Sequence, residues 1–199
     1  MVTPKREWFP GVSYHITSRG NHRNDIFRDE ADFGMYLILM KECLKYYEKY
    51  NYKLICYCLM TNHVHLLIQA NDREVSDLIR RLHSMYSRYF NKKYKYIGHL
   101  WQDKYFPELI QDDKQMLTTS RYIHLNPFRA KMVKMPEEYK WSSYKIYIGE
   151  EKDKLISSEK ILLYFKEENK HKLYRNFVES DLKIRIDEMQ GGSVNGSSS

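Results

Sequence analysis

Apolar and polar positions follow one another along the chain in two rhythms, one with a period of two residues and one with a period between three and four. The first rhythm is typical of β-strands and the second of amphipathic helices. In chain order they predict a strand at 12–18, a helix at 29–50, strands at 52–60 and 64–69, a helix at 74–91, a strand at 100–110 and a helix from 112 or 113 to 126.

Local signals indicate how these elements connect. Only residues 61–63 separate the second strand from the third, which predicts a tight antiparallel hairpin. Asp112 or Asp113 can cap the third helix, and Pro127 is expected to end or kink it after Asn126. The resulting order, β-α-β-β-α-β-α, predicts an α+β protein with a ferredoxin-like antiparallel sheet and helices packed on one face.

The pattern is looser after residue 137. We expect an edge element at 141–148, a solvated linker at 149–154 and two short helices within 157–187. The glycine- and serine-rich end predicts a disordered tail. The chain is therefore divided into a main domain at 1–148, a helical extension at 149–190 and a tail at 191–199.

Composition narrows the class of partner. Lys and Arg number 33 against 26 Asp and Glu, which gives a net charge of +7, and this excess favours a polyanion. The longest apolar run, 54–60, is far shorter than the roughly 18 residues of a membrane span, and no secretory signal begins the chain. We therefore expect a cytoplasmic protein with no membrane partner. Three cysteines, with Cys56 and Cys58 on one strand face, favour reduced core thiols over disulfides or structural zinc.

Two histidines form the first candidate site. His63 and His65 flank Val64 at the start of the third strand, so both imidazoles should lie on one face of the sheet. Two ring nitrogens on one face make half of a divalent-metal site. A histidine on a sheet is more often a hydrogen-bonded packing residue, so the pair alone leaves both readings open.

The third helix supplies the other half of this candidate. Its polar residues recur at spacings of four, three and four, and so form one stripe: Gln115, Thr119, Tyr122 and Asn126. The amide oxygen of Asn126 can join two imidazoles on a metal, while the phenol of Tyr122 points at whatever the metal polarises. Such mixed nitrogen and oxygen ligands suit Mg²⁺ or Mn²⁺ better than a closed zinc site. With 18 tyrosines in the chain, Tyr122 can equally be a packing residue.

Three segments, in this order, carry a family resemblance: LMTNHVHLLIQ at 59–69, GHLWQDKYF at 98–106 and SRYIHLNPFRAKMV at 120–133. Together they resemble the one-tyrosine HUH transposases, and more narrowly the REP-associated tyrosine transposases. The segment HITSRGNHRNDIF at 15–27 is similar to that family's first strand and loop. The resemblance covers residues 8–148, and the joint occurrence of three motifs is more specific than any one of them.

The resemblance implies roles for individual residues. His63 and His65 match the metal ligands, Tyr122 matches the nucleophile, and Asn126 stands where relatives have a third polar ligand. It also implies an Mg²⁺- or Mn²⁺-dependent endonuclease and strand-transferase that forms a 5′-phosphotyrosine link and leaves a free 3′-hydroxyl. The implied partner is single-stranded DNA with a hairpin and a flanking guide, bound by a monomer or a homodimer.

Further residues are candidates for DNA contact. Basic side chains and one histidine can follow a phosphate backbone: Arg19, His22, Arg23, Arg80, Arg81, Arg88, Lys92, Lys93, Lys95 and Lys104. Two aromatic residues can stack on unpaired bases: Trp101 and Tyr105. The simpler interpretation is a solvated basic face and two core aromatics.

Three other functions remain compatible with this sequence. A nucleic-acid-binding protein of the same fold would use sheet aromatics and leave the histidines incidental, although the chain lacks an RNP-like run. A second is a relative that binds DNA as a repressor or repair accessory without catalysis. A third is a metal-dependent hydrolase with a water nucleophile, which would survive the change of Tyr122 to Phe.

Overall fold

The computed structural model describes residues 8–191. The regular elements, in chain order, are β1 Val12–Arg19, α1 Glu30–Tyr46, β2 Lys53–Met60, β3 His63–Ala70, α2 Val75–Tyr94, β4 Phe106–Leu109, α3 Asp113–Arg129, α4 Tyr144–Tyr147, α5 Glu159–Leu162 and α6 Lys170–Gly191. Of the tail predicted at 191–199, all but the first residue lies outside the described part.

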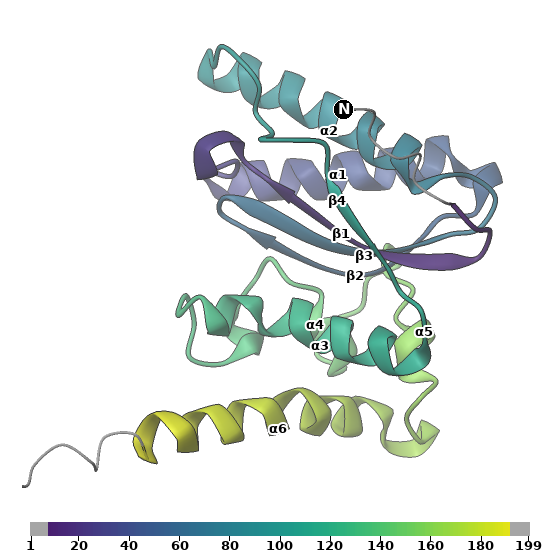
Figure 1. The fold of residues 1–199 in the computed structure, drawn as a ribbon, viewed down its shortest axis with the longest axis vertical. Coiled ribbons are helices and arrows are strands. Elements are labelled where there is room, and N and C mark those ends of the chain that lie inside the picture. The colour runs from purple at the N-terminus through teal and green to yellow at the C-terminus, as the bar shows by residue number, and fades with distance from the viewer. Residues whose placement is uncertain (1–7, 192–199) are drawn as a thin grey trace, which may run out of the picture.

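The sheet has the predicted ferredoxin-like topology. Its strand order is β2-β3-β1-β4, and every neighbouring pair is antiparallel. The β2–β3 hairpin turns at Thr61 and Asn62, as the short spacer predicts. Helices α1 and α2 lie together on one face of the sheet, above it in Figure 1. The predicted fold class is therefore confirmed.

The third helix lies on the other face of the sheet, where it packs against β2 and β3, and α4 and α6 lie beyond the sheet on the same side (Figure 1). The sequence prediction placed all helices on one face. The two central strands explain the difference, because β2 and β3 are buried along almost their whole length instead of on alternate residues. A strand that is apolar on both sides needs a cover on both sides. All three cysteines, Cys43 on α1 and Cys56 and Cys58 on β2, are buried free thiols.

Several predicted boundaries were wrong. Helix α1 ends at Tyr46 instead of residue 50, and α2 continues to Tyr94 instead of residue 91. The fourth strand covers only Phe106–Leu109, because residues 100–105 follow a separate path on which Trp101 bridges to Gly20. Helix α3 continues past Pro127 to Arg129. A proline this close to the end of a helix forfeits one backbone hydrogen bond, which the last turn tolerates. Pro107 is tolerated in β4 for a related reason, since β4 is an edge strand.

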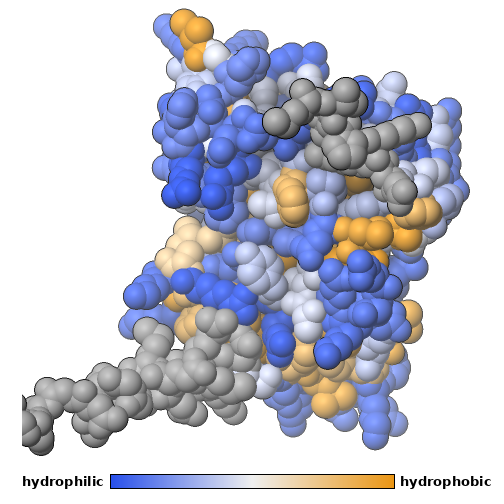
Figure 2. Space-filling view, viewed as in Figure 1, coloured by the Kyte–Doolittle hydropathy of each residue, from blue (hydrophilic) through white to orange (hydrophobic). Residues whose placement is uncertain are grey.

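The region after residue 137 also differs from expectation. Residues 141–148 contain the short helix α4 instead of a strand, although Ser142 forms a single bridge to Cys58 of β2. The exposed linker at 149–154 precedes the four-residue α5. Helix α6 is 22 residues long, not short. Within the described residues, no helix is both long and apolar enough to cross a membrane, and Figure 2 shows hydrophilic residues over most of the visible face.

A buried polar network joins α6 to α3. The His124 Nδ1 atom lies 2.7 Å from the Tyr174 hydroxyl, and its Nε2 atom lies 2.9 Å from Ser143 Oγ. Tyr174 donates to Ser120 Oγ at 3.1 Å. Burial lowers the pKa of His124 to about 3, so its imidazole is neutral and uses both nitrogens in hydrogen bonds. The network fixes the position of the middle of α3, next to Tyr122.

These buried histidines predict a stability that falls in mild acid. Burial lowers the pKa of both His83 and His124 to about 3, so between pH 6.5 and 3 only the unfolded chain binds the proton. The contribution of each histidine to the free energy of unfolding is therefore fully present above pH 6.5. At pH 5 the free energy of unfolding should be lower by about 2 kcal/mol per histidine. Denaturant unfolding at pH 7 and pH 5 measures the change. Replacing the exposed His99 with Ala should leave the difference in stability between pH 7 and pH 5 unchanged. Equal denaturant midpoints at both pH values would contradict the prediction.

Candidate active site

His63 and His65 lie on the face of β3 that α3 crosses. In the sheet register His63 is opposite Arg19, and His65 is opposite Thr17. The two ring centroids are 5.0 Å apart. His65 is buried and His63 half-buried. The period-two spacing therefore brings both imidazoles to one face, as expected.

The Nδ1 atoms of both rings face partners within the chain. His65 Nδ1 lies 3.0 Å from His15 Nε2 and 3.3 Å from Thr17 Oγ1, and His63 Nδ1 lies 2.6 Å from Asn62 Oδ1. His15 Nδ1 in turn lies 3.4 Å from a carboxylate oxygen of Glu108. Within residues 8–191, the Nε2 atoms of His63 and His65 have no hydrogen-bond partner, so they are the nitrogens that a ligand can reach.

The electrostatics of this cluster keep the rings neutral. Burial, aided by the positive charge of Arg19, lowers the pKa of His63 to about 4. Burial lowers the pKa of His65 well below its usual value, and the neighbouring His15 and His63 add to the effect. Burial also lowers the pKa of His15, against the opposing influence of Glu108. Neutral imidazole is the form that binds a metal ion.

Tyr122 projects from α3 over these histidines. Its ring meets the rings of His65 and His15 edge-on, with centroids 5.5 and 5.8 Å away. The guanidinium carbon of Arg129 lies 5.1 Å from the centroid of the Tyr122 ring. Tyr122 is 40% exposed, although its neighbours Ile123 and Leu125 are fully buried. The phenol is thus held beside the imidazoles and remains open to a large substrate.

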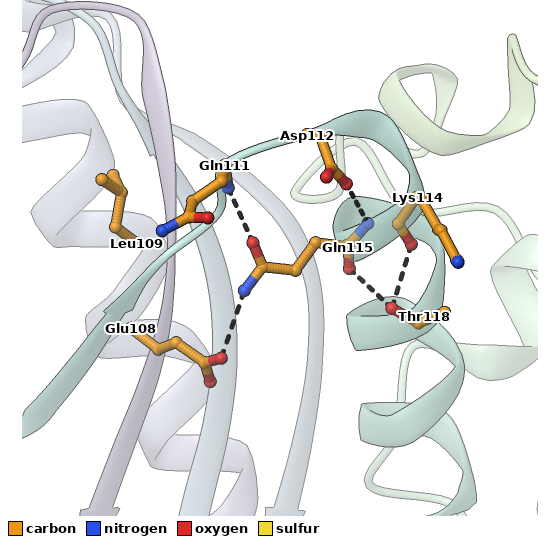
Figure 3. A pocket seen from close by; sticks show the side chains of 7 residues that line it. All are labelled: Glu108, Leu109, Gln111, Asp112, Lys114, Gln115 and Thr118. Carbon is orange, nitrogen blue, oxygen red and sulfur yellow. Dashed lines mark hydrogen bonds between the residues drawn. The ribbon is translucent and has the colours of Figure 1, made fainter.

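The other members of the polar stripe on α3 point in different directions. Asn126 donates from Nδ2 to the Tyr122 carbonyl oxygen at 2.8 Å, which leaves its amide oxygen for another partner. Gln115 turns toward β4, where it donates to Glu108 at 3.2 Å and accepts from the Gln111 amide at 2.7 Å (Figure 3). Thr119 is buried. Gln115 lines an open pocket of about 530 Å³ between β4 and α3.

A metal ion at this site would need the histidines and a ligand of another type. The described residues contain no group of three or more His, Cys, Asp or Glu side chains arranged to hold a metal. His15 does not complete such a group, because its nitrogens face His65 and Glu108. Neutral rings with occupied Nδ1 atoms and reachable Nε2 atoms nevertheless fit a metal ligand pair. The amide oxygen of Asn126 has the chemistry of a third ligand.

Part of the predicted DNA-contact set lies beside the histidines. Arg19 is opposite His63, and the loop that carries His22 and Arg23 is tied to the β2–β3 turn. Gly20 lets this loop fold back on itself, since a Cβ there would lie 2.2 Å from the Asn24 carbonyl oxygen. These residues are therefore placed where they could contact a DNA strand that reaches the site.

The basic residues of α2 lie on the opposite face of the sheet from Tyr122 (Figure 1). Lys93 pairs with Asp29 and Asp32 at 2.7 Å, and the Arg81 guanidinium stacks 3.7 Å from the Tyr46 ring centroid. The remaining basic residues of this region are exposed: Arg80, Arg88, Lys92 and Lys95. The structure does not bring this group to the candidate site.

The two predicted stacking aromatics are half-buried and packed against the protein core. The Trp101 ring stacks on His83 with centroids 4.0 Å apart, and Tyr105 packs against the hydrophobic core. Lys104 is exposed just before β4. Sequence reasoning missed His15 and Glu108, which only the register of β1 with its neighbours brings to the site. The alternation of His15, Thr17 and Arg19 along β1 was the available signal.

Comparisons with known proteins define the class. A family model described as "Transposase IS200 like" matches residues 9–126, more than half of the chain. The chain belongs to the IS200-like transposase family. The resemblance drawn from the sequence motifs is confirmed.

Two relatives extend this result. One is a protein of Haemophilus influenzae, named as a candidate REP-associated tyrosine transposase, which is 30% identical over 109 residues. That match covers 49% of this chain and 61% of the relative. The other is a solved REP-associated tyrosine transposase bound to a REP hairpin, with a TM-score of 0.61 and 16% identity over 74% of this chain and 86% of that one. At this identity the second likeness supports the fold.

Proposed function

We propose that this protein cleaves and rejoins single-stranded DNA beside a hairpin, with Tyr122 as nucleophile and a divalent metal ion, Mg²⁺ or Mn²⁺, held by His63, His65 and Asn126. The observation that carries the proposal is the position of the Tyr122 ring, which is 40% exposed and has its centroid 5.5 Å from that of the His65 ring. A nucleophile beside a pair of neutral metal ligands is an arrangement that suits metal-assisted phosphoryl transfer.

Bonds and protons balance in the proposed cleavage step. The Tyr122 oxygen attacks the scissile phosphorus, the new O–P bond forms, and the bond from phosphorus to the 3′-oxygen breaks. The phenol gives up one proton and the departing 3′-oxygen takes one up, so no proton is consumed overall. The product is a 5′-phosphotyrosine ester, and attack on it by another 3′-hydroxyl rejoins the strand without a nucleotide cofactor.

The neighbouring residues bind and orient the reacting groups. When bound, the metal ion offsets the charge of the scissile phosphate. The hydrogen bond from Asn126 to the Tyr122 carbonyl braces the turn of α3 that carries the phenol. Arg19, beside His63, adds positive charge where the phosphate backbone enters.

A hairpin-bearing single strand is the substrate that the relatives and the charge support. The solved transposase with this fold is bound to a REP hairpin. The net charge of +7 favours a polyanion. Arg19 and the loop at 20–24 then lie on the path of a strand that leads to Tyr122.

The test is a covalent-adduct assay. A pool of hairpin-bearing single-stranded DNAs is incubated with the protein and Mn²⁺, or with EDTA, and the products are separated on a denaturing gel. Mass analysis of the tryptic peptide that contains Tyr122 should show attached nucleotides only in the presence of metal. Tight DNA binding without an adduct or cleavage would overturn the proposal in favour of a DNA-binding regulator of the same fold.

The contact between His15 and His65 predicts an effect on metal affinity. Changing His15 to Ala removes the group that faces His65 Nδ1 and should weaken Mn²⁺ binding by about 10- to 100-fold, as loss of an outer hydrogen-bond partner does. Titration calorimetry with Mn²⁺ measures the change, and the exposed His99→Ala is the matched control. Equal affinities in the His15 variant and the unaltered protein would refute this prediction.

A further inference from the structure

Phe106 lies on one edge of the sheet, two strands from the histidines of the candidate site. It begins β4, the edge strand, and pairs with Thr17 of β1. The Thr17 hydroxyl in turn lies 3.3 Å from His65 Nδ1. Directly paired residues of antiparallel strands project on the same side. Phe106 therefore projects on the face of the sheet that carries His65.

The side chain of Phe106 is exposed to solvent over 68% of its surface. Along β4, exposed and half-buried residues alternate. Tyr105, Pro107 and Leu109 form the half-buried set, and Tyr105 and Leu109 pack against the core. Phe106 shares the exposed set with Glu108, which reaches His15. Folding therefore leaves a large apolar ring in water on the face that carries the candidate site.

The geometry points to a new nucleotide subsite: we propose that Phe106 stacks on the base of a nucleotide close to the scissile phosphate. This inference rests on the proposed function. It assigns to Phe106 the stacking role that the sequence suggested for Trp101, whose ring is already stacked on His83.

The distances across the sheet suit this role. Neighbouring strands lie about 4.8 Å apart, so β4 is roughly 10 Å from β3 and its histidines. A DNA strand held at Tyr122 can cover that distance with a few nucleotides. Since β4 is the edge of the sheet, no further strand of the sheet lies beyond Phe106.

The chemistry of a phenyl ring selects the kind of contact. Phe106 has no hydrogen-bonding group, so it can stack on any of the four bases but cannot tell them apart. It would hold the strand in place, while sequence choice falls to other residues. A nucleobase is the occupant that fits, because the proposed substrate brings unpaired bases to this face and the chain carries a net charge of +7.

The experiment is a coupling test between the protein and single positions of the DNA. The probe is a hairpin oligonucleotide with unpaired flanks, prepared as a series in which one flank position at a time is abasic. Binding is measured by fluorescence anisotropy in a Tyr122→Phe background, so that covalent chemistry does not contribute. The variants are Phe106→Ala, Phe106→Leu and, as a matched exposed apolar control, Ile97→Ala, whose side chain is 95% exposed.

We expect Phe106→Ala to weaken binding of the intact probe by about tenfold, the size of one base–aromatic stack. At one flank position the abasic probe should show the same loss with unaltered Phe106, and no further loss with Phe106→Ala. Phe106→Leu should behave like Phe106→Ala, because it keeps an apolar side chain but no ring. Ile97→Ala should bind as the background protein does.

Two results would overturn the inference. One is undiminished binding by Phe106→Ala. The other is a Phe106→Ala loss that stays the same for every abasic probe. A thermal unfolding curve for each variant shows that its fold is intact. Because no cleavage is needed, failure of the adduct assay and failure of the Phe106 coupling are separate results.

Discussion

Tyr122→Phe is expected to remove the covalent link to DNA and to lower the rate of nicking by about 10³-fold or more, because phenylalanine has the same ring without the attacking oxygen. The Tyr122 side chain is 40% exposed and its hydroxyl is not part of the buried network, so the fold should be unchanged. Binding of a hairpin oligonucleotide should stay within about twofold of the unaltered protein. Denaturing gels measure nicking, and anisotropy measures binding.

The matched control for this change is Tyr46→Phe. Tyr46 is also an exposed helical tyrosine, 61% exposed on α1, but it lies on the opposite face of the sheet. It should nick at the normal rate. If Tyr122→Phe nicks as fast as Tyr46→Phe, the nucleophile is a water molecule or another residue, and the hydrolase alternative gains support.

His63→Ala and His65→Gln are expected to have the second large effect. Each removes one of the two neutral imidazoles that face the site, so Mn²⁺ affinity should fall by more than the roughly 100-fold that loss of an outer partner can cause. Nicking should fall in parallel, and excess Mn²⁺ should restore part of it. Metal titration and nicking rates at several Mn²⁺ concentrations measure both effects.

The choice of variants separates loss of metal from loss of fold. His63 is half-buried and tolerates alanine, whereas His65 is buried, so glutamine keeps its volume and polarity. His99→Ala, on an exposed loop residue, should keep both metal affinity and nicking. Normal Mn²⁺ affinity in both folded variants would show that the histidines do not hold the metal.

The sequence predicted the parts of this molecule that depend on local pattern. The spacing of His63 and His65 places two side chains on one face of any β-strand, and the spacing of Tyr122 and Asn126 places both on one face of any helix. The strand order followed from the number and order of the elements. These predictions needed no knowledge of which segments pack together.

Other features depend on contacts between distant segments. The location of α3 on the second face follows from the burial of β2 and β3 on both sides, which a continuous apolar run hints at but does not specify. His15 joins the site only through its pairing register with neighbouring strands. Trp101 is an aromatic residue of the kind that stacks on DNA bases, but its ring is already stacked on His83 within the protein.

The network that ties α6 to α3 has a consequence for how the protein is assembled. Tyr174 and His124 hold the tyrosine-bearing helix on the sheet of the same polypeptide, so Tyr122 already lies over its own His65. One chain thus brings together both halves of the candidate site.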